Sequence, residues 1–268
     1  MRAFLICFSF AVLAGCSSMS KKPPAAALTD LAPKGTLRAA INVGNAVLAA
    51  RGPGGGQPTG ISVDLARELG RRLGVPVQLI VFDAAGKVVE AGKALGWDIA
   101  FVALDPARAA EIAQSPPYVQ IEGAYLVRNE SPLKMNDEVD RKGNRVVVGR
   151  NSAYDLYLTR ALKNAEIVRT PTSAMVVDTL LKENYEVGAG VKQALENDAR
   201  RVPGVRLLPG RFMVINQAMA SQKGKDAGAR YVREFIEEMK ASGFVAKAIE
   251  RHKQPSAVLA PAGDPSGS

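Results

Sequence analysis

An arginine near the middle of the chain occupies the predicted start of a helix. Arg108 follows Asp105 and Pro106, which are typical of a helix N-terminus because aspartate caps free N–H groups and proline suits the first turn. The helix dipole disfavours a cation there unless an anion approaches it. A guanidinium can form two parallel hydrogen bonds with a carboxylate. Arg108 is therefore a candidate for binding a carboxylate, and the alternative is a solvated surface arginine.

Ser152 is a second candidate for binding an anion. It lies in the stretch Gly149-Arg150-Asn151-Ser152-Ala153-Tyr154, at the start of a predicted helix over residues 152–163. Free backbone N–H groups in the first turn of a helix form an anion site together with a serine hydroxyl, and the adjacent Asn151 is a further candidate. The alternative is an ordinary N-cap serine, and both interpretations can hold together.

Histidine and cysteine are too scarce for several kinds of chemistry. The 268-residue chain has one histidine, His252, and two cysteines, Cys7 and Cys16. A histidine-rich zinc site and a Ser-His-Asp relay therefore lack the residues that they need in the body of the fold. Both cysteines lie in the first 16 residues, so no disulfide can support the folded part. We expect neither a metal site nor a cofactor.

Basic residues outnumber acidic ones. The chain has 35 Lys and Arg against 26 Asp and Glu, a formal net charge of +9, which favours anionic partners in general. Arg71-Arg72 and Arg200-Arg201 have no aromatic residues interleaved, so we expect no nucleic acid and interpret the excess as surface charge, toward an anionic envelope. The glycine-rich stretch 51–58 lacks the Gly-Lys-Ser/Thr of a phosphate-binding loop and is interpreted as a flexible surface loop.

The N-terminus carries an export signal. Met1 and Arg2 precede an apolar run from Ala3 to Val12, which has the length of a signal-peptide core and is too short to span a bilayer. The run ends in Leu13-Ala14-Gly15-Cys16, which resembles the lipobox of bacterial lipoproteins. The resemblance implies removal of residues 1–15, lipidation of Cys16 and a membrane anchor. The alternative is an ordinary secretory signal.

The region between the N-terminus and the tail alternates between strands and helices. Residues 16–34 are rich in Ser, Lys, Pro and Ala and predict a flexible tether, and residues 253–268 predict a disordered tail. Apolar runs predict strands at 37–43, 77–82 and 97–102, with helices that begin near Ser62, Asp83 and Asp105. Strict alternation of strand and helix indicates a parallel sheet with right-handed crossovers.

The same alternation restarts after residue 129 and predicts a second lobe. Its expected elements are strands at 145–149, 167–169 and 187–190 and helices at 152–163 and 172–183. An extended segment at 211–220 and a helix at 226–240 have no strand partner nearby, so we expect them to return to the first lobe. The prediction is thus a lobe 1 of residues 35–129 plus 212–252 and a lobe 2 of residues 130–211, with connections near 128–131 and 210–212.

Several stretches resemble, in order and spacing, the family 3 solute-binding proteins of ABC transporters, which have the type II periplasmic-binding-protein fold. They are Gly35-Thr36-Leu37-Arg38, Thr59 to Ala66, Arg72 to Val75, Trp97-Asp98-Ile99-Ala100, Pro106 to Ala109, Ser115 to Tyr118 and Glu238 to Phe244. The resemblance implies a two-lobed α/β clamp with two hinge crossovers that closes on a small anionic or zwitterionic solute. It also implies delivery to an ABC permease from the periplasm or cell envelope, and we expect a monomer.

The resemblance gives roles to individual residues. Arg108 matches the arginine that grips the α-carboxylate of the ligand, and Ser152 matches the helix start that faces it across the cleft. Asn45 lies where the family has a cleft loop, and Tyr118 could cover an apolar part of the ligand or be a buried core residue. Trp97 is interpreted as a core residue.

Two departures from the family pattern concern the ligand. Ala103 and Phe101 stand before Arg108 where amino-acid binders often have polar contacts, and Lys192 lies near the place of an aspartate that receives the ammonium group. If Lys192 faces the cleft, an anion without an α-amino group is favoured. The alternative is a solvated lysine at a helix start.

Two other functions stay open. An enzyme that resembles cyclohexadienyl dehydratases would need a general acid with a raised pKa, and Glu122 and Glu186 are the acids near strand ends. An envelope sensing or interaction lipoprotein would have a cleft without a solute. The prediction is a lipid-anchored solute-binding protein that is not an enzyme.

Overall fold

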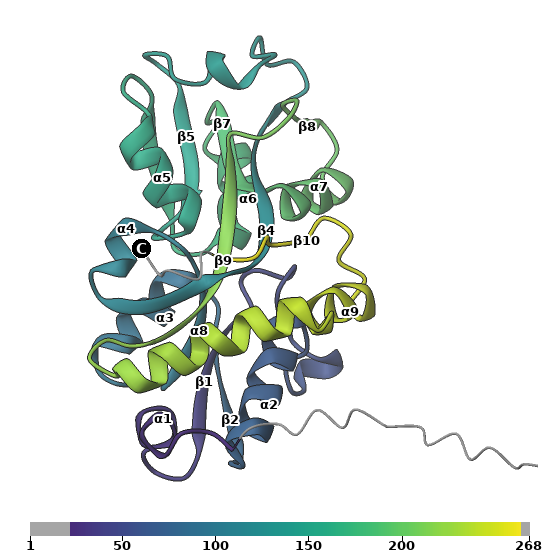
Figure 1. The fold of residues 1–268 in the computed structure, drawn as a ribbon. Coiled ribbons are helices and arrows are strands. Elements are labelled where there is room, and N and C mark those ends of the chain that lie inside the picture. Colours follow the sequence, from purple (N-terminus) through teal and green to yellow (C-terminus); the bar gives the residue numbers. More distant parts are fainter. Residues whose placement is uncertain (1–21, 264–268) are drawn as a thin grey trace, which may run out of the picture.

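The computed structural model of the chain describes residues 22–263, in which strands and helices alternate (Figure 1). The first half contains α1 (Ala25–Leu31), β1 (Leu37–Asn42), α2 (Ile61–Leu73), β2 (Val77–Phe82), α3 (Ala85–Lys93), β3 (Ile99–Ala103), α4 (Pro106–Ala109) and β4 (Ile112–Arg128). The second half contains β5 (Arg145–Gly149), α5 (Ala153–Ala161), β6 (Glu166–Thr170), α6 (Val176–Lys182), β7 (Val187–Val191), α7 (Lys192–Arg201), β8 (Val205–Leu207), β9 (Met213–Gln222), α8 (Asp226–Ala241), α9 (Phe244–Arg251) and β10 (Val258–Leu259). Short 3-10 turns lie at Pro53–Gly55, Asn136–Glu138 and Ser173–Met175.

The two lobes repeat one strand order. In lobe 1, β1 lies between β2 and β3 and is parallel to both. In lobe 2, β5 lies between β6 and β7 and is again parallel to both. Helices cover these sheets, and β3 is buried along its whole length, as expected of a nearly all-apolar strand covered on both faces. The predicted α/β fold is confirmed, but β9 and β4 join the parallel strands of the two lobes into one continuous sheet, in the order β2-β1-β3-β9-β4-β7-β5-β6.

Two long antiparallel strands join the lobes. β4 and β9 pair with each other from Ile112 to Gly123, and β9 also pairs with β3 in lobe 1. From Gly123 onward β4 pairs with β7 in lobe 2. The sequence placed the first connection near residues 128–131, but the change of partner comes earlier, inside a continuous strand. The sequence did not predict this strand because it contains Pro116 and Pro117, which have no backbone N–H to donate. The strand accommodates them by shifts of register between Gln114 and Val119.

Helix α1 lies inside the segment that was predicted as a flexible tether. Ala27 and Leu31 are fully buried, α1 packs on α8, and the N–H of Gly228 at the start of α8 donates to Asp30 Oδ2 at 3.0 Å. The prediction of an unstructured chain up to residue 34 is therefore wrong for residues 25–31. The burial of two apolar side chains outweighs a composition that is typical of linkers.

The predicted disordered tail also contains structure. β10 pairs with β4, and Ala257 and Ala260 on either side of it are 5% and 3% exposed.

The two helix caps predicted at Ser62 and Asp83 are shifted as well. α2 begins at Ile61 with Gly60 as its N-cap, and α3 has Ala84 as its N-cap.

Trp97 is fully buried and its indole N–H donates to the Val88 carbonyl at 2.8 Å, which confirms that it is a core residue.

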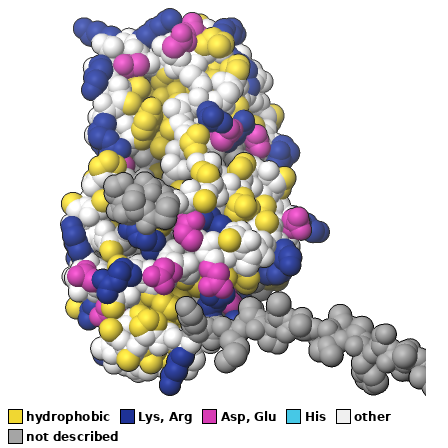
Figure 2. All heavy atoms as spheres, viewed as in Figure 1, with side chains coloured by type: hydrophobic (Ala, Val, Ile, Leu, Met, Phe, Trp, Pro, Cys, Tyr) yellow, Lys and Arg dark blue, Asp and Glu magenta, His cyan; other side chains and the backbone are white. Residues whose placement is uncertain are grey.

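The surface carries Lys, Arg, Asp and Glu side chains in mixture on the face that Figure 2 shows, in keeping with an excess of positive charge spread over the surface. Among residues 22–263, no helix is both long and apolar enough to cross a membrane.

Candidate functional site

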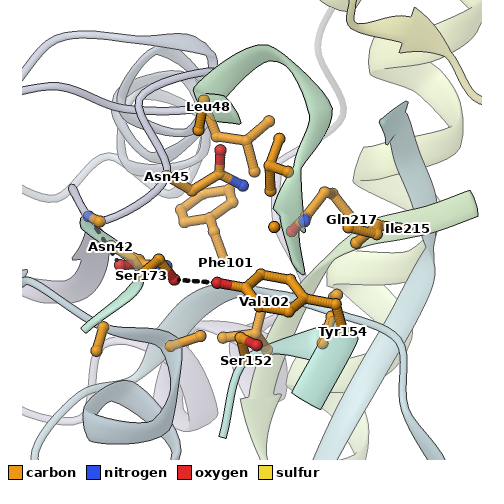
Figure 3. Close-up of a pocket in the computed structure, with 18 of the residues that line it drawn as sticks. Asn42, Asn45, Leu48, Phe101, Val102, Ser152, Tyr154, Ser173, Ile215 and Gln217 are labelled. Carbon is orange, nitrogen blue, oxygen red and sulfur yellow. Dashed lines mark hydrogen bonds between the residues drawn. The ribbon is translucent and has the colours of Figure 1, made fainter. Parts of the chain in front are cut away.

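A cavity lies between the lobes, where the parallel strands of both lobes end (Figure 3). Its walls come from the ends of β1, β3 and β7, from the segments that follow β1, β3, β5 and β7, and from β9. The carboxyl ends of parallel strands are the usual place for ligands in α/β folds. The inner cavity has a volume of about 70 Å³. A groove of about 470 Å³ borders it and shares Gly44, Ser173, Ala194 and Asp198 with its wall.

Arg108 lines this cavity and is almost fully buried, with 3% of its surface exposed. Its guanidinium donates to the carbonyl of Ala103 at 3.0 Å and to the carbonyl of Asn151 at 2.8 Å. No carboxylate of residues 22–263 forms an ion pair with it within 4 Å. Burial lowers the pKa of Arg108 from 12.5 to about 10, and the charge of Asp105 opposes this only in part. A buried cation without a counter-ion is costly, so this site favours an anion.

The helix that carries Arg108 is short. Asp105 caps α4 as predicted, with Oδ1 accepting the N–H of Ala107 at 2.9 Å, but α4 ends at Ala109. Four residues have a small dipole, so the argument from the dipole is weak. Arg108 is instead buried by the contact between the lobes. A side chain on Gly86 would collide with Asn151, since an added Cβ would lie 2.7 Å from its Cβ.

An ion pair beside Arg108 also joins the lobes. Arg160 of α5 donates to the two carboxylate oxygens of Asp105 at 2.7 and 3.4 Å. Asp105 is buried, whereas about half of the Arg160 side chain is exposed. In this structure the lobes are therefore in direct contact around Arg108.

Ser152 lines the cavity and is 7% exposed. It is the N-cap of α5, since its Oγ accepts the N–H of Asp155 at 3.0 Å. Asp155 in turn accepts the N–H of Asn151 at 2.7 Å, and it forms an ion pair with Arg169. The helix start thus already holds an acidic side chain, which competes with a bound anion. Asn151 contributes its main-chain carbonyl to Arg108, and its side chain does not line the inner cavity.

Asn45 lies in the cavity wall, as the resemblance implied. Its Oδ1 is buried and has no hydrogen-bond donor among residues 22–263. Figure 3 shows Asn45, Gln217 and Tyr154 directed toward the same space, with the Tyr154 hydroxyl donating to Ser173 Oγ at 2.7 Å. A buried acceptor without a donor is uncommon and favours a ligand that brings N–H or O–H groups.

Tyr118 and Lys192 lie away from the inner cavity. Tyr118 is fully buried in the core, where its hydroxyl lies 3.1 Å from Ser62 Oγ and its ring meets that of Phe101 edge to face at 6.0 Å. Burial raises the pKa of Tyr118 above its usual value. Lys192 donates to Glu122 Oε2 at 2.8 Å, on the wall of a different cavity. The structure therefore places neither side chain at the candidate site.

Several polar residues of the wall were not identified from the sequence. Among them are Gln217 of β9, Asp198 of α7, Arg150 after β5, Asn42 at the end of β1 and Ser173. Asp198 accepts from Arg201 at 2.9 Å through Oδ1. It lies in the second turn of a mostly polar helix, so only the placement of α7 against lobe 1 reveals that it faces the cleft.

The two candidate general acids are both held as carboxylates. Lys192 and Arg211 donate to Glu122 and lower its pKa, and Arg145 donates to Glu186 and lowers its pKa. Neither residue lines the inner cavity. Within residues 22–263, no three His, Cys, Asp or Glu side chains are grouped as metal ligands. Cys16 lies outside the described residues.

Comparisons with known proteins identify the family. No protein with a curated function matches the chain. The fold is similar to an arginine-binding protein of T. maritima (TM-score 0.72, 18% identity, covering 85% of this chain and 99% of that one). It is also similar to the L-cysteine receptor of Neisseria gonorrhoeae (0.74, 20%, 85% and 94%) and to AncCDT-1, an ancestral amino-acid-binding protein and precursor of cyclohexadienyl dehydratase (0.70, 20%, 84% and 97%). Residues 37–255 match the sequence pattern of one family, and the chain belongs to the bacterial extracellular solute-binding proteins, family 3.

Proposed function

We propose that this chain captures a small carboxylate-bearing solute between its lobes and delivers it to an ABC permease, while Cys16 anchors it to a membrane by lipid. The observation that carries the proposal is the buried guanidinium of Arg108, which faces the inner cavity without a carboxylate partner among residues 22–263. Its hydrogen bonds to the carbonyls of Ala103 and Asn151 use two of five N–H groups, so donors are left for a solute carboxylate.

The wall of the cavity favours a zwitterion over a simple anion. Lys192 is paired with Glu122, which removes the reason to expect a solute without an amino group. Asp198 and Asn45 both line the cavity, and the carboxylate of Asp198 and the unpartnered Oδ1 of Asn45 can both accept hydrogen bonds from a solute. We infer that an ammonium group binds at these acceptors while the carboxylate binds Arg108, so the solute is an amino acid. The outer groove leaves room for its side chain.

The geometry does not favour the dehydratase alternative. A general acid at neutral pH needs a raised pKa, whereas cationic partners lower the pKa of Glu122 and of Glu186. The similarity to AncCDT-1 supports binding, since that protein is described as an amino-acid-binding precursor of the enzyme.

A thermal-shift screen of the purified chain tests the proposal. The screen pairs each L-amino acid with the 2-oxo acid that lacks its amino group, and includes dicarboxylates. We expect one or a few amino acids to raise the melting temperature and their 2-oxo acids to do so less. Stabilisation by 2-oxo acids alone would refute the ammonium site, and failure of every carboxylate would refute the proposed function.

A further inference from the structure

After α9 the chain passes beside the junction of the lobes. Residues 254–263, here called the C-terminal strap, run from the end of α9 past the middle of β4 (Figure 1). They lie at the end of the family match, which stops at residue 255.

The strap is attached firmly to lobe 1. Val258 and Leu259 pair with Gln120 and Val119 of β4, and the N–H of Ala260 donates to the Tyr118 carbonyl at 3.2 Å. Further along, Lys240 of α8 donates to the Pro261 carbonyl at 2.7 Å. Glu237 of the same helix accepts the N–H of Gly263 at 3.1 Å. Backbone pairing and side-chain clamps thus hold both halves of the strap.

Strand pairing places the strap at the turning point between the lobes. Residues 119 and 120 of β4 pair with β9 on one edge and with β10 on the other. Gly123 likewise pairs with β9 and, on the opposite edge, with β7 of lobe 2. β10 and β7 therefore lie on the same edge of β4, and only Ile121 and Glu122 separate their partners. Any rotation of the lobes about β4 has to occur within this short interval.

One hydrogen bond connects the strap to lobe 2. Ser256 Oγ donates to Gln193 Oε1 at 2.8 Å, and Gln193 is the second residue of α7, directly after β7. Ser256 comes two residues before β10, so it moves with lobe 1. If lobe 2 swings away from lobe 1, this bond must lengthen and break.

We propose that the C-terminal strap is a third connection between the lobes and that the Ser256–Gln193 bond favours the closed arrangement. An intramolecular hydrogen bond of average strength changes an equilibrium about fivefold. Without it, the ratio of closed to open molecules falls by about that factor, and any solute that requires the closed form binds correspondingly less tightly.

The test measures the distance between the lobes without a solute. Spin labels are placed at Arg71→Cys in lobe 1 and Lys182→Cys in lobe 2, which are 65% and 81% exposed, in the full chain with Cys7 and Cys16 replaced by serine. Double electron–electron resonance then gives the distance distribution. We expect Ser256→Ala and Gln193→Ala each to lower the ratio of the shorter-distance population to the longer-distance population about fivefold. The double variant should lower this ratio no further. Leu259→Met is the matched control in the strap, because this side chain is 38% exposed and does not line the cavity that Ser256 and Gln193 share.

An unchanged distribution in both single variants would overturn the proposal, as would a wild-type chain with no population at the shorter distance. Truncation after Gln254 gives an independent measurement, since it removes β10 together with Ser256. We expect it to increase amide exchange at Ile121 and Glu122 beyond the increase in Ser256→Ala. Equal exchange at these two amides in the truncated and wild-type chains would also contradict it.

Discussion

Replacing Arg108 by methionine separates binding from stability. The pKa of Arg108 falls from 12.5 to about 10 on burial, which corresponds to about 3 kcal/mol against keeping the charge in the empty cavity. The variant is relieved of this cost but loses two charge-assisted hydrogen bonds to main-chain carbonyls, which together contribute about 3 kcal/mol at the lower end of the usual range. The two effects nearly cancel. We therefore expect Arg108→Met to have nearly the stability of the wild type when no solute is present.

The additional stability that a bound solute gives should disappear in Arg108→Met. A solute at a hundred times its dissociation constant adds about 2.7 kcal/mol to the wild type, which raises the melting temperature of a chain of this size by about 5–10 °C. Loss of a buried partner for the carboxylate costs about 3–5 kcal/mol, so binding should weaken at least a hundredfold and the shift should vanish at the same concentration.

The assay is thermal unfolding with and without the best amino acid of the screen, followed by calorimetric titration. Arg67→Met is the matched control, because Arg67 is an exposed residue of α2 and lies outside both the cavity and the groove. It should keep the full shift. A normal shift in Arg108→Met would refute the role of Arg108. A variant that is several kcal/mol less stable without solute would refute the cancellation argued above.

Three further predictions concern other contacts. Asp198→Asn should weaken amino-acid binding about tenfold while leaving binding of the matching 2-oxo acid unchanged. Paired titrations measure the difference, and equal weakening of both ligands would show that the ammonium group does not bind Asp198. Arg160→Met should separate the lobes, because it breaks the ion pair with Asp105 across the cleft, and small-angle scattering should report a larger radius of gyration. Glu122→Gln should destabilise the chain by at most about 1 kcal/mol, because the carboxylate that pairs with Lys192 is about one-third exposed. Since the folded pKa of Glu122 lies below 4.5, this difference should be present above pH 4.5 and disappear as the pH falls through the lowered pKa, which urea titrations at several pH values would measure.

Local patterns in the sequence predicted most of the fold. Alternating apolar runs and helix caps such as Asp105 and Ser152 act within a few residues, so the order of strands and helices in both lobes follows from them. Long-range contacts decided the elements that were missed. β4 contains two prolines and depends on β9 for its pairing, and α1 depends on α8, which follows it by about 200 residues.

The same distinction applies to the site. Arg108 and Asn45 could be predicted because they follow strand ends, where the cleft of such a fold must lie. The position of Lys192 could not, because its partner Glu122 is 70 residues away. Tyr118 occupies the core because Ser62 supplies a partner for its hydroxyl there. Asp198 faces the cavity only through the packing of a helix whose sequence is mostly polar.

If Cys16 is lipidated as proposed, helix α1 limits how far the folded body can move from a membrane. It lies at the end of lobe 1 remote from lobe 2 in Figure 1 and is fixed to α8. Only eight residues lie between a lipidated Cys16 and Ala25, so the reach is at most about 30 Å, near the length of one small domain. An anchored chain would then be held by lobe 1 as the fixed part, while lobe 2 is the part free to swing. Such a short connection would restrict the protein to permeases that lie near its anchor in the same membrane.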